Sequence, residues 1–145
     1  LAAALTEMYA DILGVDIEIN QVSWDAFQED LYNHVFQMFM LGWVADYPDP
    51  EDFLDVLFHS ESEQNHARYR NPEVDALLEQ ARGESNHDKR MELYRQAEEM
   101  IVHDAPWVPI YHGINYVLVK PYIEGLTVTP QGEYHLTEAR FVGGS

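Results

Sequence analysis

The apolar positions in the first third of the chain change from helical spacing to strand spacing and back. Between residues 1 and 13 they form a helical stripe that Gly14 ends. Over 15–19 they alternate with polar residues, as in a strand with one solvated face. Ser23 then caps another helix, and an almost uninterrupted apolar run over 35–41 predicts a strand buried on both faces. This order of helix, strand, helix and strand predicts an α/β layout with parallel pairing.

A polar and aromatic turn follows the apolar run and leads directly into another helix. Asp46 lies just past the run, where the carboxyl ends of strands line the ligand crevice of open α/β sheets. Asp49 is the expected N-cap of the helix, Pro50 fits its first position, and Asp52 lies where a capping box would place it. The apolar spacing continues to Phe58. The pattern therefore predicts strand, turn and helix, with Asp46 in the turn.

The middle of the chain predicts two further helices. The polar stretch 59–70 has no periodicity and is expected to be a surface loop. Asn71 caps a helix over 72–83, and a second helix begins at Ser85 or Asn86 and stops before the next proline. Beyond it, short β-like runs over 108–111 and 116–119 predict strands, separated by glycine and proline.

The turn also carries a family resemblance. Gly42-Trp43 and Ala45-Asp46, followed by Asp49-Pro50 and Phe53, resemble the C-terminal lobe of the extracellular solute-binding proteins of ABC importers, the oligopeptide and dipeptide-binding family. Further segments agree in order and spacing: Tyr69, Asn71-Pro72, Arg90, Leu93-Tyr94, Ala97-Glu98, Ala105-Pro106, Val108-Pro109, Val119-Lys120-Pro121 and Gly125. The resemblance covers nearly the whole chain, but only the C-terminal portion of a two-lobed protein.

This resemblance implies a fold and an organisation. The fold is α/β, one lobe of a two-lobed periplasmic-binding-protein-like (type II) fold with a mixed sheet flanked by helices. Residues 1–115 would form the C-terminal ligand-binding lobe, and 116–145 would return toward an N-terminal lobe that this sequence does not include. Residues 1–13 lack the features of an export signal, so we expect the signal in that other part. The apolar residues of 116–145 would lack native partners in the fragment, which makes self-association plausible.

The resemblance also implies a function and a site. The chain would belong to an extracytoplasmic receptor, periplasmic or anchored at the cell surface, that binds short peptides and delivers them to an ABC permease in the membrane. Asp46 matches an aspartate that pairs with the α-amino group of the peptide, and a carboxylate suits this task because it accepts a charge-assisted hydrogen bond. Trp43, Val44 and Tyr47 would lie at the same pocket.

Other interpretations of the same residues stay open at this stage. Asp46 could be a plain turn former, and Trp43 could be a core residue. A receptor for oligosaccharides would also use Trp43 and Trp107, by stacking on sugar rings. A different class of protein, an acid/base hydrolase, would use Asp46 as its catalytic carboxylate.

Composition narrows these choices. The formal net charge is -18, and no Lys or Arg occurs before Arg68, so nucleic acid is not an expected partner. The absence of cysteine excludes thiol catalysis and disulfides. The seven histidines show no metal-binding spacing, and no nucleotide or nucleophile motif occurs, so we expect no metal, no cofactor and no enzymatic activity.

Overall fold

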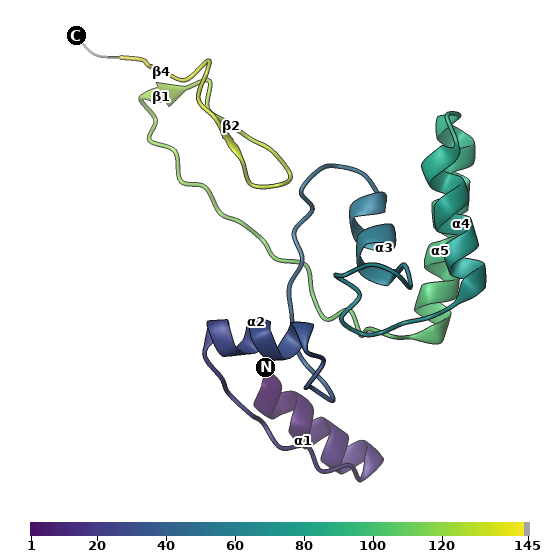
Figure 1. Cartoon of the computed structure of the whole chain (residues 1–145). Helices are drawn as coiled ribbons and strands as arrows, with labels where there is room; N and C mark the ends of the chain where they lie inside the picture. Colours follow the sequence, from purple (N-terminus) through teal and green to yellow (C-terminus); the bar gives the residue numbers. More distant parts are fainter. Residues whose placement is uncertain (144–145) are drawn as a thin grey trace. The chain divides into compact units, whose positions relative to one another are not determined.

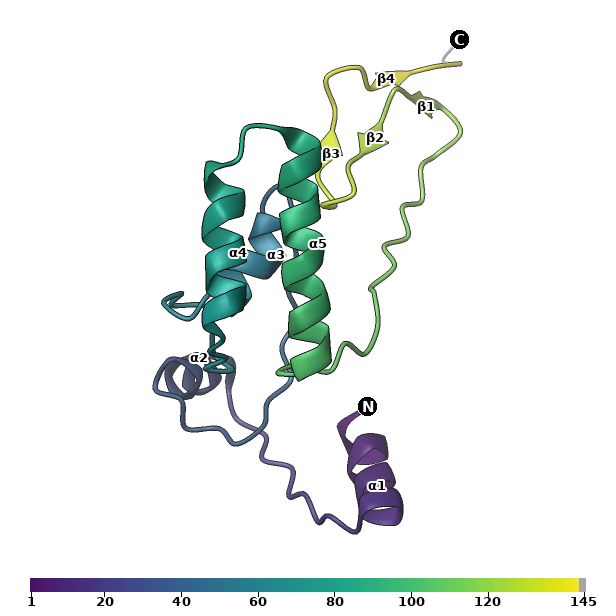
Figure 2. The ribbon, with the colours of Figure 1, turned by 90° about the vertical axis from the view of Figure 1, so that its right-hand side faces the viewer.

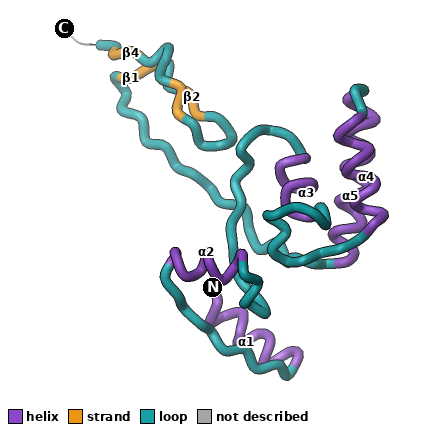
Figure 3. The backbone as a smooth tube through the Cα atoms, in the orientation of Figure 1, coloured by secondary structure: helices purple, strands orange, loops and turns teal. Residues whose placement is uncertain are grey.

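The computed structural model describes residues 1–143 of the chain, in five helices and four short strands (Figures 1 and 3). The elements in chain order are α1 (Ala2–Leu13), α2 (Trp24–Tyr32), α3 (Glu51–Phe58), α4 (Pro72–Gly83), α5 (His87–Asp104), β1 (Ile123–Glu124), β2 (Thr127–Val128), β3 (Tyr134–His135) and β4 (Arg140–Phe141). They fall into two compact units, residues 1–39 and the chain from Met40 onward. The division predicted at residues 115 and 116 stays a prediction, and Gly144 and Ser145 of the predicted segment 116–145 lie outside the described residues.

The first unit contains α1, α2 and the extended segments beside them. Gly14 ends α1 in the left-handed conformation with φ 66°, as the sequence predicts. The Ser23 side chain accepts a hydrogen bond from the Ala26 backbone N–H at 3.4 Å, so the predicted cap of α2 is confirmed. The aromatic ring of Phe27, on α2, stacks on that of Phe36, with 5.2 Å between the ring centroids.

The prediction of strands over 15–19 and 35–41 is wrong. Neither 15–19 nor 35–41 joins a ladder among residues 1–143, and no parallel pair is found in that range. The second run is not buried either, since Val35 and Met38 are 62% and 63% exposed. A strand differs from a helix because its backbone hydrogen bonds come from a neighbouring strand, and the described residues supply no neighbour for either segment.

The core of the second unit lies between α3, α4 and α5. Figure 2 shows α4 and α5 running antiparallel side by side, with α3 packed across them. The residues at the centre are at most 2% exposed: Leu57, Val74, Leu78, Ala81, Tyr94 and Ala97. Asn71 caps α4 by accepting from the Glu73 N–H at 3.0 Å, and Asn86 caps α5 by accepting from the Lys89 N–H at 3.0 Å. These helices are therefore confirmed, and their periodic apolar stripes form one core.

The chain beyond α5 is extended and then forms two small antiparallel pairs. The strands predicted over 108–111 and 116–119 have no ladder partner in the described part of the chain, and Leu118 is 99% exposed. β1 pairs with β4 and β2 with β3. Gly125, with φ 76°, is required between β1 and β2, since a Cβ there would lie 2.0 Å from the Glu138 carbonyl oxygen.

Candidate ligand-binding site

The predicted site residues lie on the segment before α3, in the second unit. We call residues 43–47 the binding loop. The helix begins at Glu51, with Pro50 at its N-cap position, one residue later than the sequence predicts. Asp49 still caps the first turn, because its Oδ1 accepts from the Glu51 backbone N–H at 3.0 Å.

Asp52 fixes both ends of the segment from Trp43 to Asp46. Its side chain is buried in the first turn of α3, with 1% of the residue exposed. The Trp43 indole Nε1–H donates to Asp52 Oδ2 at 3.0 Å, and the Asp46 backbone N–H donates to the same oxygen at 3.1 Å. The predicted capping box is therefore wrong. It would have the Asp52 side chain accept from the Asp49 backbone N–H, but the carboxylate accepts from the binding loop instead.

An ion pair fastens the start of α3 to α5. Arg90 Nη1 and Nη2 donate to the two carboxylate oxygens of Asp49 at 2.6 and 2.8 Å. The guanidinium also lies over the Tyr94 ring, 4.9 Å from its centroid, and Nη2 donates to the Tyr94 hydroxyl oxygen at 3.2 Å. The hydrogen bonds from Arg90 lower the pKa of Asp49, and the same bonds raise the pKa of Arg90.

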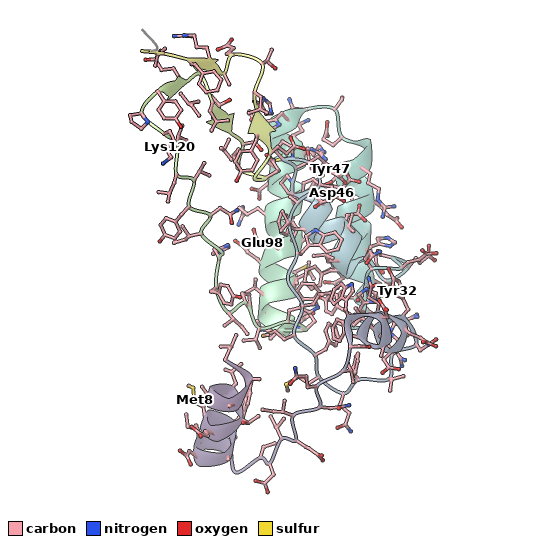
Figure 4. The ribbon with its side chains drawn as sticks, turned by 90° about the vertical axis from the view of Figure 1, so that its left-hand side faces the viewer. Met8, Tyr32, Asp46, Tyr47, Glu98 and Lys120 are labelled. Atoms are coloured by element: carbon pink, nitrogen blue, oxygen red, sulfur yellow. The ribbon has the colours of Figure 1, made fainter. Side chains whose placement is uncertain are left out.

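These contacts leave the side chains of the binding loop in different environments. Asp46 is exposed, and among residues 1–143 no basic side chain forms an ion pair with its carboxylate. Val44 is 70% exposed and Tyr47 39% exposed. Partial burial, followed by the charge of nearby carboxylates, raises the pKa of the Tyr47 phenol. Figure 4 shows Asp46 and Tyr47 on the loop that precedes α3.

Trp43 has a packing role of its own. Its side chain is half-buried and packs against the core cluster of α3, α4 and α5. The alternative of a packing residue is therefore partly correct, although one face of a half-buried indole can still meet a ligand. Its contact with a ligand stays a prediction.

Two hollows in the described part of the second unit lie away from the binding loop. One is around Met100 on α5, and the other is between His59 and Arg82. Within the described range, no three His, Asp or Glu side chains gather as a metal site would require. The same residues contain no helix of sufficient length and apolarity to cross a membrane.

The sequence reasoning missed the residues that hold the loop. The sequence indicates a capping role for Asp52, and for Arg90 it indicates nothing beyond the family resemblance. Trp43 and Asp52 are 9 residues apart in the chain, whereas Asp49 and Arg90 are 41 residues apart. Local spacing therefore carries no signal for the ion pair between Asp49 and Arg90. The hydrogen bond between Trp43 and Asp52 does have a local signal. A tryptophan and a turn are followed by a helix that has a carboxylate in its first turn.

Comparison with known proteins shows which proteins this chain resembles. Residues 1–65 match the profile of bacterial extracellular solute-binding proteins, family 5 Middle. The oligopeptide-binding protein OppA of Bacillus subtilis is 30% identical over 141 residues, which is 97% of this chain and 26% of that protein. Heme-binding protein A of Haemophilus influenzae is 32% identical over 127 residues, 85% of this chain and 23% of that protein.

A solved structure agrees with the sequence relatives. The dipeptide-binding protein from Pseudoalteromonas sp. SM9913, in complex with Met-Leu, superposes with a TM-score of 0.77 and 32% identity. The match covers 97% of this chain and 28% of that one. The chain therefore spans about a quarter of the length of the relatives it matches.

Fold and sequence together are similar to one lobe of periplasmic binding proteins, with the α/β class that the sequence predicts. The chain is similar to the bacterial extracellular solute-binding proteins of family 5 over part of their length. Members of that family are binding proteins and are extracellular by description, which agrees with the predicted extracytoplasmic location.

Proposed function

We propose that this chain is part of an extracytoplasmic receptor that binds short peptides for import by an ABC transporter. The observation that carries the proposal is the Asp46 carboxylate, which is exposed while the backbone that bears it is fixed by Asp52. A carboxylate held in this way is suited to accept a hydrogen bond from the ammonium group of a peptide. The relative solved with Met-Leu supports a ligand of this class.

The other residues of the binding loop would surround the ligand. Val44 and Tyr47 project into solvent in this chain, and Trp43 offers the accessible part of a rigid indole. Such side chains contact a ligand at a low cost in conformational entropy. The remaining contacts would come from the part of the relatives that this chain does not span, including the N-terminal lobe toward which residues 116–145 are predicted to return.

The surroundings of Asp46 favour binding over catalysis. An acid/base hydrolase would need a second carboxylate available beside it. Two carboxylates that follow it in the chain are already engaged, since Asp49 pairs with Arg90 and Asp52 accepts from Trp43 and the Asp46 N–H. We therefore propose a receptor without enzymatic activity.

The name of the Haemophilus relative suggests heme as a second candidate ligand, and an oligosaccharide remains the third. Neither heme nor a neutral sugar carries an α-ammonium group. Both candidates therefore predict that Asp46 contributes little to affinity. The charge of Asp46 is the feature that separates peptide from the other two.

Isothermal titration calorimetry on the full-length receptor that contains this chain tests the proposal. Ligands are trialanine, N-acetyl-trialanine, heme and a trisaccharide. We expect Asp46→Asn to weaken binding of the free peptide by more than ~2 kcal/mol, because its ammonium would be buried without a countercharge. The acetylated peptide should lose much less, and Asp88→Asn, an exposed aspartate on α5, should change neither. Equal losses for the two peptides would show that Asp46 is not the partner of the amine.

A further inference from the structure

We propose that Asp52 is the positioning residue of the binding loop: its buried carboxylate fixes the Trp43 indole and the Asp46 backbone, and so aims the Asp46 side chain at the ligand. The part of this inference that concerns ligand affinity rests on the proposed function. The part that concerns the geometry of the loop does not.

The geometry is that of one acceptor shared by two donors. Asp52 Oδ2 receives the Trp43 indole N–H at 3.0 Å and the Asp46 backbone N–H at 3.1 Å. Both are ordinary lengths for N–H···O bonds, and an ionised acceptor makes such bonds stronger. Because Trp43 and Asp46 lie at opposite ends of the loop's first four residues, one oxygen fixes that stretch at both ends.

The position of Asp52 makes it a rigid anchor. The residue lies in the first turn of α3, where the helix dipole stabilises a negative charge. It is 1% exposed, so surrounding side chains restrict its rotamers. An anchor on a helix places a bound group more precisely than an anchor on another loop would.

Asp55 provides a natural comparison on the same helix. It is also buried, at 4% exposed, and its two carboxylate oxygens accept a bidentate pair of hydrogen bonds from Arg82 of α4. Asp55 therefore ties α3 to α4, whereas Asp52 ties α3 to the binding loop. Removing either carboxylate should lower stability, but only removal of Asp52 should release the loop.

Nuclear magnetic resonance on the 145-residue chain measures the release directly. The three tryptophans have different indole environments: Trp43 Nε1–H donates to a carboxylate, Trp24 is 60% exposed, and Trp107 Nε1 is buried without a hydrogen-bond partner in the described part of the chain. We expect the Trp43 indole proton to resonate downfield of that of Trp24 and to exchange more slowly with solvent.

Variants of Asp52 and Asp55 then distinguish a loss of loop positioning from a general loss of stability. Asp52→Ala should move the Trp43 indole resonance upfield and speed exchange of the Asp46 amide, while Asp55→Ala leaves both unchanged. Asp52→Asn keeps an oxygen acceptor and should restore the indole resonance most of the way. An unchanged Trp43 resonance in Asp52→Ala overturns the proposal. If that variant does not fold, the unmodified chain decides: a Trp43 indole that exchanges as fast as that of Trp24 also overturns it.

Peptide affinity in the full-length receptor tests the functional consequence. Asp52→Ala should weaken trialanine binding by roughly tenfold to hundredfold, the range seen when outer-shell partners of ligating groups are removed. Asp52→Asn should recover most of the affinity, and Asp55→Ala should leave it within a factor of about three. Undiminished affinity of Asp52→Ala would overturn the role in positioning. If the unmodified receptor binds no peptide, the proposed function fails, while the resonance of Trp43 still decides how the loop is held.

Discussion

Breaking the ion pair between Asp49 and Arg90 should lower the stability of the helical unit. The pair is bidentate, at 2.6 and 2.8 Å, and its side chains are 27% and 21% exposed. A fully exposed pair contributes at most about 1 kcal/mol, whereas hydrogen bonds to charged groups contribute about 1.5–3 kcal/mol when buried. The intermediate burial here leads us to expect a coupling energy of about 2 kcal/mol between the two side chains.

A double-mutant cycle of Asp49→Ala and Arg90→Met measures this coupling. The free energy of unfolding is obtained from urea denaturation followed by circular dichroism at the helix band. Loss of the bond from the Glu51 N–H to Asp49 occurs in both arms and cancels. Arg95→Met is the matched control, because Arg95 pairs with Glu92 and Glu99 on an exposed face of the same helix, where solvent screens the charges and the pairs should contribute much less.

The pH dependence of the coupling has a definite sign. The pKa of Asp49 is lower in the folded chain than in the unfolded chain, where it is near 3.9. Its stabilising contribution is therefore fully present above that value and is lost as the pH falls through the lower, folded pKa. We expect full coupling at pH 7 and reduced coupling at pH 3. A coupling below ~0.5 kcal/mol at pH 7, or one equal to the Arg95 control, would refute the role of this pair.

Four other outcomes are expected. Leu78→Ala empties a site that is 0% exposed and should cost ~2–5 kcal/mol in urea denaturation; a cost below ~1 kcal/mol would mean that the core is not formed as described. Asn71→Ala removes the cap of α4 and should cost ~1 kcal/mol, and an unchanged midpoint would contradict that assignment. The 145-residue chain alone should fold yet bind trialanine only at about millimolar or weaker, because it offers part of a site; micromolar binding abolished by Asp46→Ala would show a complete site. Residues 116–143 should exchange their amides faster than α5 and mediate self-association in sedimentation, and uniform protection in a strict monomer is the contrary result.

The helices of this chain were predictable because their signals are local. Asn71 and Asn86 lie at the caps of α4 and α5, and Gly14 ends α1, each where the sequence places it. Caps and helical hydrogen bonds join residues a few positions apart, so a short stretch of sequence contains the whole interaction. The core follows from the same stripes once the helices exist.

The absence of the expected strands and the contacts that hold the binding loop and the start of α3 could not be predicted from local signals. The apolar run over 35–41 has the composition of a buried strand, but strand formation depends on a partner that residues 1–143 do not provide. The position of Asp46 after the run could be predicted, and so could its exposed carboxylate. The pairing of Asp49 with Arg90 could not, because only tertiary packing brings α5 to the start of α3.

The sharing of one Asp52 oxygen between the two ends of the loop has a consequence for how the proposed receptor could diversify. The groups that hold the loop are an indole N–H and a backbone N–H, so the side chains at positions 44 and 47 take no part in the anchor. Val44 and Tyr47 can therefore be exchanged at little cost to folding, as expected of exposed sites. Under the proposed function, ligand preference could therefore change by mutation at these two positions while the backbone that presents Asp46 is kept unchanged.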